Sequence, residues 1–175
     1  MYYLKGIFGY YTNIIVKFGN IMKIIILRHG EATFANSDRI LSSAGMRQAA
    51  ATGTKLSALV KVTKCFSSPK TRAVQTAQIV CNQLGFTGEI EYLNELTPSG
   101  NTDYLISFIE ACCDKSDVIL LVSHLPLVEN LAYELCKKTK IPPQFDTACS
   151  LVIDFNGQMG HFEQFVSPFK EDVIF

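Results

Sequence analysis

Two short segments that are apolar almost throughout, each followed at once by polar residues, constrain the fold of this chain more than any other feature of its sequence. Residues 23–27 read KIIIL and precede the polar tripeptide RHG, and residues 118–122 read VILLV and precede the dipeptide SH. Strands of a parallel sheet are covered on both faces and are therefore apolar throughout, whereas strands with one solvated face alternate. Both segments therefore predict strands buried inside an α/β sheet.

The rest of the chain alternates between helical and extended patterns. Apolar residues recur with a helical period in four segments, and short extended segments separate them. Asn156-Gly157 is a strong signal for a β-hairpin turn. We predict helices at 43–60 (capped by Ser42 or Ser43), between Pro69 and Gly85, at 102–113 (with Leu105, Ile109 and Cys112 inward) and after Pro126, and further strands at 62–66, 89–93, 147–155 and 161–166. This order predicts a three-layer α/β/α sandwich with a mostly parallel central sheet and a C-terminal antiparallel hairpin.

The predicted domain covers residues 22–175, and residues 1–21 form an N-terminal extension. The extension is apolar and aromatic-rich, but Lys5 and Lys17 interrupt it, so it is a poor membrane-spanning helix. It also lacks a small-residue cleavage site after an apolar stretch. We interpret it as an upstream start or a poorly packed addition to a domain that begins at Met22. The alternative is an anchor at a membrane interface or on a partner, using Tyr2, Tyr3, Phe8, Tyr10 and Tyr11.

The overall composition excludes several classes of protein. Lysine plus arginine equals aspartate plus glutamate, 16 of each, so no basic face suggests nucleic-acid binding. The six cysteines form no CxxC pair and no zinc-ligand spacing. We expect reduced, mostly buried thiols in a cytoplasmic protein that binds no metal or other cofactor.

Basic side chains follow three of the predicted strands. Arg28 and His29 follow the first apolar strand, Arg72 comes soon after the strand at 62–66, and His124 follows the strand at 118–122. The carboxyl ends of parallel strands meet at one edge of the sheet, where ligands of such folds bind. Two arginines and two histidines at one edge predict an anion site. The third histidine, His161, has no such setting, and we expect it to be structural.

Each of these residue types suits phosphoryl chemistry. Guanidinium groups bind phosphoryl oxygens with two hydrogen bonds and stay charged. A neutral imidazole is a good nucleophile near pH 7, and a second, protonated imidazole would donate to the transferring group. These cations would supply the electrostatic role that a metal plays elsewhere.

Four ordered motifs resemble the histidine phosphatase superfamily, which includes phosphoglycerate mutases and acid phosphatases. They are RHGE at 28–31, LSxxGxxQA at 41–49, SPxxRAxQTA at 68–77 and VSH at 122–124. Three more segments are similar to the small bacterial phosphohistidine phosphatases of that superfamily: ELTPxG at 95–100, SHLPLV at 123–128 and PxFxT at 143–147. The resemblance runs from about residue 22 to about residue 168.

The resemblance implies a role for each matching residue. His29 matches the histidine that is transiently phosphorylated, and Arg28, Arg72 and His124 match the rest of the phosphate pocket. A carboxylate that protonates the leaving group would be Glu95 or, less favoured, Glu31. The imidazole of a phosphohistidine leaves easily, however, so a strong acid matters less for that substrate.

Only 51 residues separate Arg72 and His124, too few for the helical lid of larger relatives. An open pocket would admit a phosphorylated side chain of another protein. We therefore expect a metal-independent phosphatase that releases inorganic phosphate from a histidine-containing phosphotransfer protein or phosphocarrier of a bacterial signalling pathway. The alternatives are a broad phosphatase for small phosphate monoesters and a module that binds phosphohistidine without hydrolysing it. A mutase is less favoured, because it needs an enclosed site.

Overall fold

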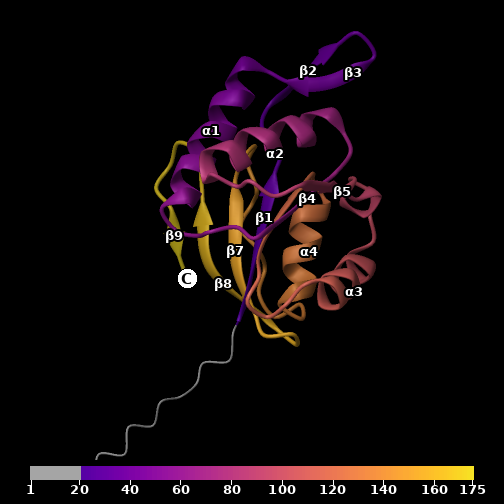
Figure 1. Cartoon of the computed structure of the whole chain (residues 1–175), viewed down its shortest axis with the longest axis vertical. Coiled ribbons are helices and arrows are strands. Elements are labelled where there is room, and N and C mark those ends of the chain that lie inside the picture. The colour runs from indigo at the N-terminus through magenta and orange to yellow at the C-terminus, as the bar shows by residue number, and fades with distance from the viewer. Residues whose placement is uncertain (1–20) are drawn as a thin grey trace, which may run out of the picture.

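The computed structural model describes residues 21–175, so the prediction for the N-terminal extension lies, apart from Ile21, outside the described residues. The strands are β1 (Met22–Arg28), β2 (Ala32–Ala35), β3 (Asp38–Leu41), β4 (Lys64–Ser67), β5 (Ile90–Tyr92), β6 (Val118–Ser123), β7 (Ser150–Phe155), β8 (Gly160–Val166) and β9 (Val173–Ile174). The helices are α1 (Ser43–Ser57), α2 (Thr71–Leu84), α3 (Thr102–Cys112) and α4 (Leu127–Leu135), with a 3₁₀ turn, η1, at Asn94–Leu96. Figure 1 shows their arrangement.

The central sheet has seven strands in the order β5-β4-β6-β1-β7-β8-β9. The first four run parallel, with Leu27 of β1 opposite Val122 of β6 and Ser67 of β4 opposite the same Val122. The hairpin β7–β8 and the short β9 add three antiparallel strands on the other side of β1. The carboxyl ends of β4, β6 and β1 therefore lie side by side at one edge, the upper edge in Figure 1.

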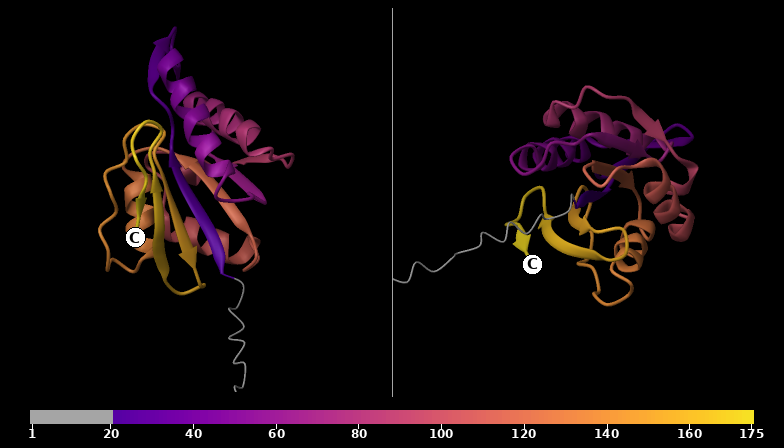
Figure 2. Two further views of the ribbon diagram at one scale, coloured as in Figure 1. Left: turned by 90° about the vertical axis from the view of Figure 1, so that its left-hand side faces the viewer. Right: turned by 60° about the horizontal axis from the view of Figure 1, so that its bottom comes forward.

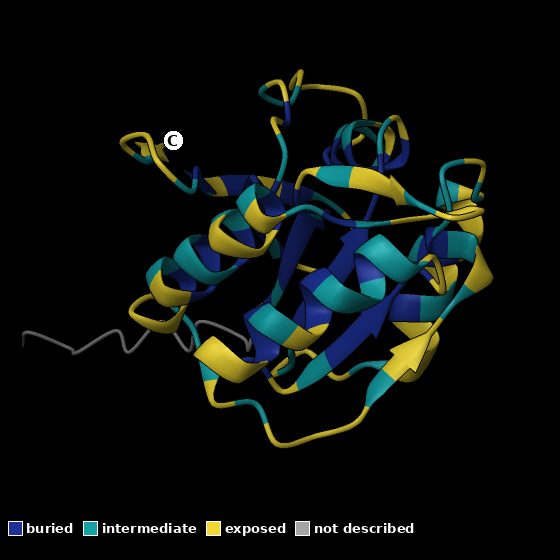
Figure 3. Cartoon of the chain, turned by 90° about the horizontal axis from the view of Figure 1, so that it is seen from above, coloured by how far each residue is buried: buried dark blue, intermediate teal, exposed yellow. Residues whose placement is uncertain are grey.

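Helices cover both faces of the sheet, as Figure 2 shows. Ile24 and Ile26 of β1 pack with α3 and α4, whereas Ile25 and Leu27 pack with α1 and α2. Both sets are fully buried, which explains why the strand sequence is apolar without alternation. Figure 3 shows the same burial along the central strands. The predicted three-layer α/β/α sandwich is confirmed.

Local signals set the ends of the helices. The Ser42 side chain accepts a hydrogen bond from the Gly45 N–H and caps α1, as predicted. Gly85 ends α2 with φ of 63°, a left-handed conformation that favours glycine. Pro126 immediately precedes the first residue of α4.

Three details differ from the sequence predictions. Cys112 lies at the exposed end of α3 and does not face the core, because the helix ends there and only Leu105 and Ile109 are buried. The hairpin β2–β3 was not predicted, because its strands are short, bury only Leu41 and carry no apolar pattern. The two-residue strand β9 is also exposed and was not predicted.

The six cysteines are all free, and Cys65, Cys81, Cys136 and Cys149 are buried. Burial raises the pKa of the Cys136 thiol to about 11, so this thiol is a weakly reactive core group. Among residues 21–175, no helix is long and apolar enough to cross a membrane.

Candidate active site

The three strand ends bring the four predicted residues together. The backbone N–H of His29 donates to the Ser123 carbonyl (2.9 Å), so β1 carries His29 to the same level as His124 beyond β6. The two imidazole rings lie with their centroids 4.8 Å apart. Arg72, in the first turn of α2, donates from Nε to Nε2 of His29 (3.2 Å). The sequence prediction that these side chains meet at one edge agrees with this geometry.

The backbone fixes the tautomer of His29. Nδ1 of this ring lies 2.7 Å from the carbonyl oxygen of Gly30, which can only accept a hydrogen bond. Nδ1 therefore carries the proton, and Nε2 has the free electron pair that faces Arg72. A neutral imidazole in this state is a nucleophile at Nε2.

Burial keeps His29 neutral. It is the main cause that lowers the pKa of His29 from 6.5 to about 4, and the positive charges of Arg72 and Arg28 lower it further. The hydrogen bond to Gly30 acts in the opposite direction. At pH 7 the ring is therefore unprotonated.

His124 is neutral as well in the free protein. Burial, followed by the neighbouring His29 and Arg72, lowers its pKa to about 3. Its Nε2 lies 2.8 Å from the Ser68 hydroxyl, while its buried Nδ1 has no hydrogen-bond partner among the described residues. The protonated His124 that we expected from the sequence therefore requires an anion, because only a nearby negative charge would offset the desolvation and the neighbouring cations.

The histidine pKa values predict how stability depends on pH. An unfolded histidine takes up a proton below about pH 6.5, whereas folded His124 stays neutral down to about pH 3. The unfolded state then binds more protons, so stability falls as the pH drops below about 6.5. We expect the free energy of unfolding of His124→Gln to decline less than that of the wild type between pH 7 and 5, measured by urea denaturation. Equal slopes, or an equally shallow slope in a control variant of exposed His161, would contradict this.

Gly30 permits the close approach of α1 to the pocket. A Cβ atom at this position would lie 2.6 Å from the carbonyl oxygen of Gly45, a backbone atom that cannot move aside cheaply. The Gly30 N–H donates to the buried Thr76 hydroxyl of α2 (3.1 Å). The loop that orients His29 is thus held between α1 and α2.

Arg28, the last residue of β1, lies close enough to both histidines for its positive charge to lower their pKa. Its Nη1 donates to the Phe145 carbonyl oxygen (2.7 Å), and its Nε is buried without a hydrogen-bond partner among residues 21–175. Burial lowers the pKa of this guanidinium from its usual value, but it remains charged at neutral pH. An anion between Arg28 and Arg72 would offset the cost of burying these charges.

Sequence reasoning missed two cations and one hydroxyl near the site. Arg39 lies on the β2–β3 hairpin, its guanidinium 5.5 Å from the Phe34 ring centroid, and its charge contributes to the lowered pKa of His29. Lys70 does the same to His124. The hydroxyl is that of Ser68. This residue begins the SPxxRAxQTA motif at 68–77, which is the only sequence feature that indicated a role for it.

The two candidate acids differ in their surroundings. The Glu31 carboxylate accepts a hydrogen bond from Ser42 Oγ (2.6 Å) at the start of α1, which is a structural contact. Glu95 lies half-buried in η1, and none of the hydrogen bonds or ion pairs among the described residues joins its carboxylate to the histidines. The assignment of Glu95 as the acid stays a prediction. In residues 21–175 no group of three or more His, Cys, Asp or Glu is arranged to hold a metal ion.

A model of the histidine phosphatase superfamily (branch 1) matches residues 24–98, which include most of β1, the Gly30 loop and Arg72. The solved structure of a phosphoglycerate mutase from Bacillus anthracis has the same fold, with a TM-score of 0.62 at 16% identity over 82% of this chain and 92% of that one. A curated relative in Escherichia coli that is 32% identical over 84% of this chain shows the family: the chain belongs to the histidine phosphatase superfamily.

Within the superfamily the chain is similar to proteins named SixA. It is 32% identical to the phosphohistidine phosphatase SixA of Escherichia coli (strain K12) over 154 residues, 84% of this chain and 94% of that protein. It is 38% identical to the SixA homolog of Haemophilus influenzae over 130 residues, 67% of this chain and 79% of the homolog. The structure of the protein histidine phosphatase SixA complexed with tungstate has a TM-score of 0.78 at 32% identity, over 84% of this chain and 97% of that one.

Proposed function

We propose that this protein hydrolyses phosphohistidine on other proteins, through a covalent phosphohistidine intermediate on His29. The observation that carries the proposal is the state of His29: Nδ1 is bonded to a backbone carbonyl, and Nε2 is unprotonated and faces Arg72. The relatives named SixA support the choice of substrate, since one of them is named a phosphohistidine phosphatase and covers most of this chain.

In the first step Nε2 of His29 attacks the phosphorus atom of the substrate. The new N–P bond forms as the bond between phosphorus and the substrate imidazole breaks, and the electron pair leaves with that imidazole. Arg28, Arg72 and His124 surround the place where the phosphoryl oxygens would lie. The negative charge of the phosphoryl group would raise the pKa of His124, and the protonated ring would then donate a hydrogen bond from Nδ1, which has no protein partner.

In the second step water attacks the phosphorus atom of phosphorylated His29. The N–P bond breaks, its electron pair returns to Nε2, and inorganic phosphate leaves. The water gives up a proton during this step. Glu95 is our proposed acid and base, acting on the leaving imidazole and then on this water.

The substrate is proposed to be a histidine-containing phosphotransfer domain or a phosphocarrier protein, which also implies a cytoplasmic location. Between Arg72 and His124 the chain contains only the rest of α2, β5, η1, α3 and β6, so no inserted helical lid covers the site among these described residues. We propose that a side chain presented on another folded protein reaches His29 at the part of its surface, 6%, that stays exposed.

The test follows phosphate release from a histidine-phosphorylated phosphotransfer domain without added metal. Para-nitrophenyl phosphate and sugar phosphates are assayed in parallel. Release from the protein substrate that exceeds release from the esters supports the proposal. Release from the esters alone would instead assign a broad phosphomonoesterase, and tight binding without release would assign a phosphohistidine-binding module.

Ser68 is expected to position His124. Its hydroxyl accepts a hydrogen bond from the Lys70 N–H (3.3 Å) and lies 2.8 Å from Nε2 of His124, so Nδ1 is the ring nitrogen that remains without a protein partner. We expect Ser68→Ala to lower kcat/KM by about tenfold, the cost of one hydrogen bond to a group that becomes charged. The matched control is Ser67→Ala, because the buried Ser67 hydroxyl donates to the Ser68 carbonyl and not to a histidine. Equal losses in both variants would show that Ser68 has only a structural role.

A further inference from the structure

Two cysteine side chains touch each other between the sheet and α2. The Sγ atoms of Cys65 on β4 and Cys81 on α2 lie 3.5 Å apart. Both side chains are buried, with 2% and 4% of the residue surface exposed, and both belong to the core cluster that α1 and α2 cover. No other hydrogen bond between two thiols occurs among residues 21–175. The proposed reaction uses neither sulfur atom.

The two sulfur atoms are close enough to bond to each other without unfolding of the protein. A disulfide bond is about 2.05 Å long, so the atoms must approach each other by roughly 1.5 Å. Rotation about χ1, the one torsion that places a cysteine sulfur, moves that atom without moving the backbone. The pair is therefore placed for oxidation within the folded protein, with β4 and α2 in their present positions.

The contact also makes the two thiols chemically unequal. The hydrogen bond from Cys65 lowers the pKa of the Cys81 thiol, and the same contact, together with burial, raises the pKa of Cys65. A thiolate at Cys81 is thus stabilised by the proton that Cys65 keeps. Because the thiolate is the reactive form of cysteine, Cys81 is the sulfur atom that reacts first.

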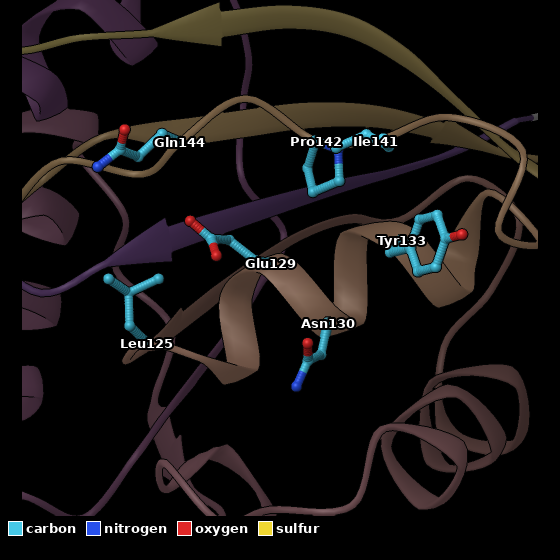
Figure 4. A pocket seen from close by; sticks show the side chains of 7 residues that line it. All are labelled: Leu125, Glu129, Asn130, Tyr133, Ile141, Pro142 and Gln144. Atoms are coloured by element: carbon cyan, nitrogen blue, oxygen red, sulfur yellow. The ribbon is translucent and has the colours of Figure 1, made fainter.

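A pocket of about 320 Å³ gives a small reagent an approach to this pair. It lies between the segment before β4 and the turn after α2, and its lining includes Val62, Leu84 and Phe86, which pack in the same core cluster as the two thiols. The Phe86 N–H donates to the Cys81 carbonyl oxygen (3.0 Å), so the pocket wall adjoins Cys81. The groove between α4 and residues 141–144, shown in Figure 4, lies against the other core cluster and does not reach the thiols.

We propose that Cys65 and Cys81 form an oxidative modification site, at which a small hydroperoxide produces a reversible disulfide bond between β4 and α2. With hydrogen peroxide, the Cys81 thiolate attacks one oxygen atom, the O–O bond breaks, and hydroxide leaves and takes up the proton that Cys81 released. Cys81 is then a sulfenic acid. The Cys65 sulfur attacks the Cys81 sulfur, the S–O bond breaks, and hydroxide leaves as water with the Cys65 proton. The two thiols lose two electrons in total, and the peroxide is reduced to two water molecules.

The bond would join two elements that hold the anion site. Arg72 lies in the first turn of α2, the Thr76 hydroxyl of the same helix accepts the Gly30 N–H, and β4 leads directly to Ser68. In the proposed cytoplasmic location thiols are kept reduced, so the bond would form under oxidative conditions and be removed by thiol–disulfide exchange. The site depends on the thiols alone and not on the proposed reaction.

The test treats the folded full chain with hydrogen peroxide, blocks the remaining thiols and maps the joined peptides by mass spectrometry. We expect a link between Cys65 and Cys81 that dithiothreitol removes. The two residues are 16 positions apart, and closing a loop of this size should raise Tm of the oxidised protein by roughly 6–12 °C above that of the reduced protein. Cys81→Ala should abolish this shift. Cys136→Ala is the control and should keep it, because Cys136 is also buried but lies in the other core cluster.

The peptide map of the wild type is decisive even if Cys81→Ala folds poorly. A link between Cys65 and Cys81 that forms only in urea would overturn the proposal, and so would links confined to the other four cysteines in the folded protein. If the link forms but Tm does not rise, the bond does not fasten α2 to β4 and the proposal fails. An equal shift of Tm in oxidised Cys81→Ala would assign the effect to a different thiol.

Discussion

His29→Ala is expected to lower turnover of the phosphorylated protein by at least ~10³-fold, because it removes the atom that accepts the phosphoryl group. Rapid-quench assays should detect no phosphorylated enzyme in this variant, whereas the wild type should form an acid-labile, alkali-stable phosphoenzyme. Binding of inorganic phosphate should weaken less than turnover, since both arginines remain.

The matched control is His161→Ala. His161 is exposed on β8, and it should keep wild-type turnover. A thermal melt of both variants separates loss of chemistry from loss of folding. If His29→Ala kept more than a few per cent of the activity while remaining folded, the assignment of the nucleophile would be wrong.

Arg72→Ala should have the second largest effect, a loss of about 10²- to 10³-fold in kcat/KM. The Arg72 Nε atom lies 3.2 Å from the attacking nitrogen, so its guanidinium can orient Nε2 and also neutralise the oxygens of the transferring group. Both effects act in the transition state, and kcat should therefore fall together with kcat/KM.

Arg72→Lys separates charge from geometry. Lysine keeps the positive charge but lacks the planar donor pair, so it should recover only part of the loss. Arg47→Ala is a suitable control, because Arg47 is exposed on α1. Full activity in Arg72→Lys would show that only the positive charge matters. Full activity in Arg72→Ala would show that Arg72 has no role in the reaction.

The sheet and its carboxyl edge were predictable because burial on both faces leaves a direct mark on the sequence. The runs at 23–27 and 118–122 predicted central strands, and the positions of His29 and His124 followed from them. Arg72 required one further step, from the strand at 62–66 across a short loop into the next helix. These three elements carry all four residues of the cluster.

The contacts that set the state of the histidines were not predictable. The acceptor for His29 Nδ1 is the backbone carbonyl of Gly30. Every residue type has such a carbonyl, so the sequence does not indicate this contact. Arg39 lies on a hairpin without an apolar pattern, so nothing in the sequence indicates that its charge lowers the pKa of His29. Such contacts depend on the path of loops in space, which local patterns do not encode.

The neutral carbonyl partner of His29 bears on the lifetime of the phosphorylated enzyme. When Nε2 carries the phosphoryl group while Nδ1 keeps its proton, the ring becomes a cation, and its bond to phosphorus is easily broken. A carboxylate at the position of the Gly30 oxygen would stabilise that cation through charge, but a carbonyl does so only through its dipole. The phosphorylated state is therefore expected to react with water quickly rather than to persist, which suits a phosphatase more than a phosphoryl carrier.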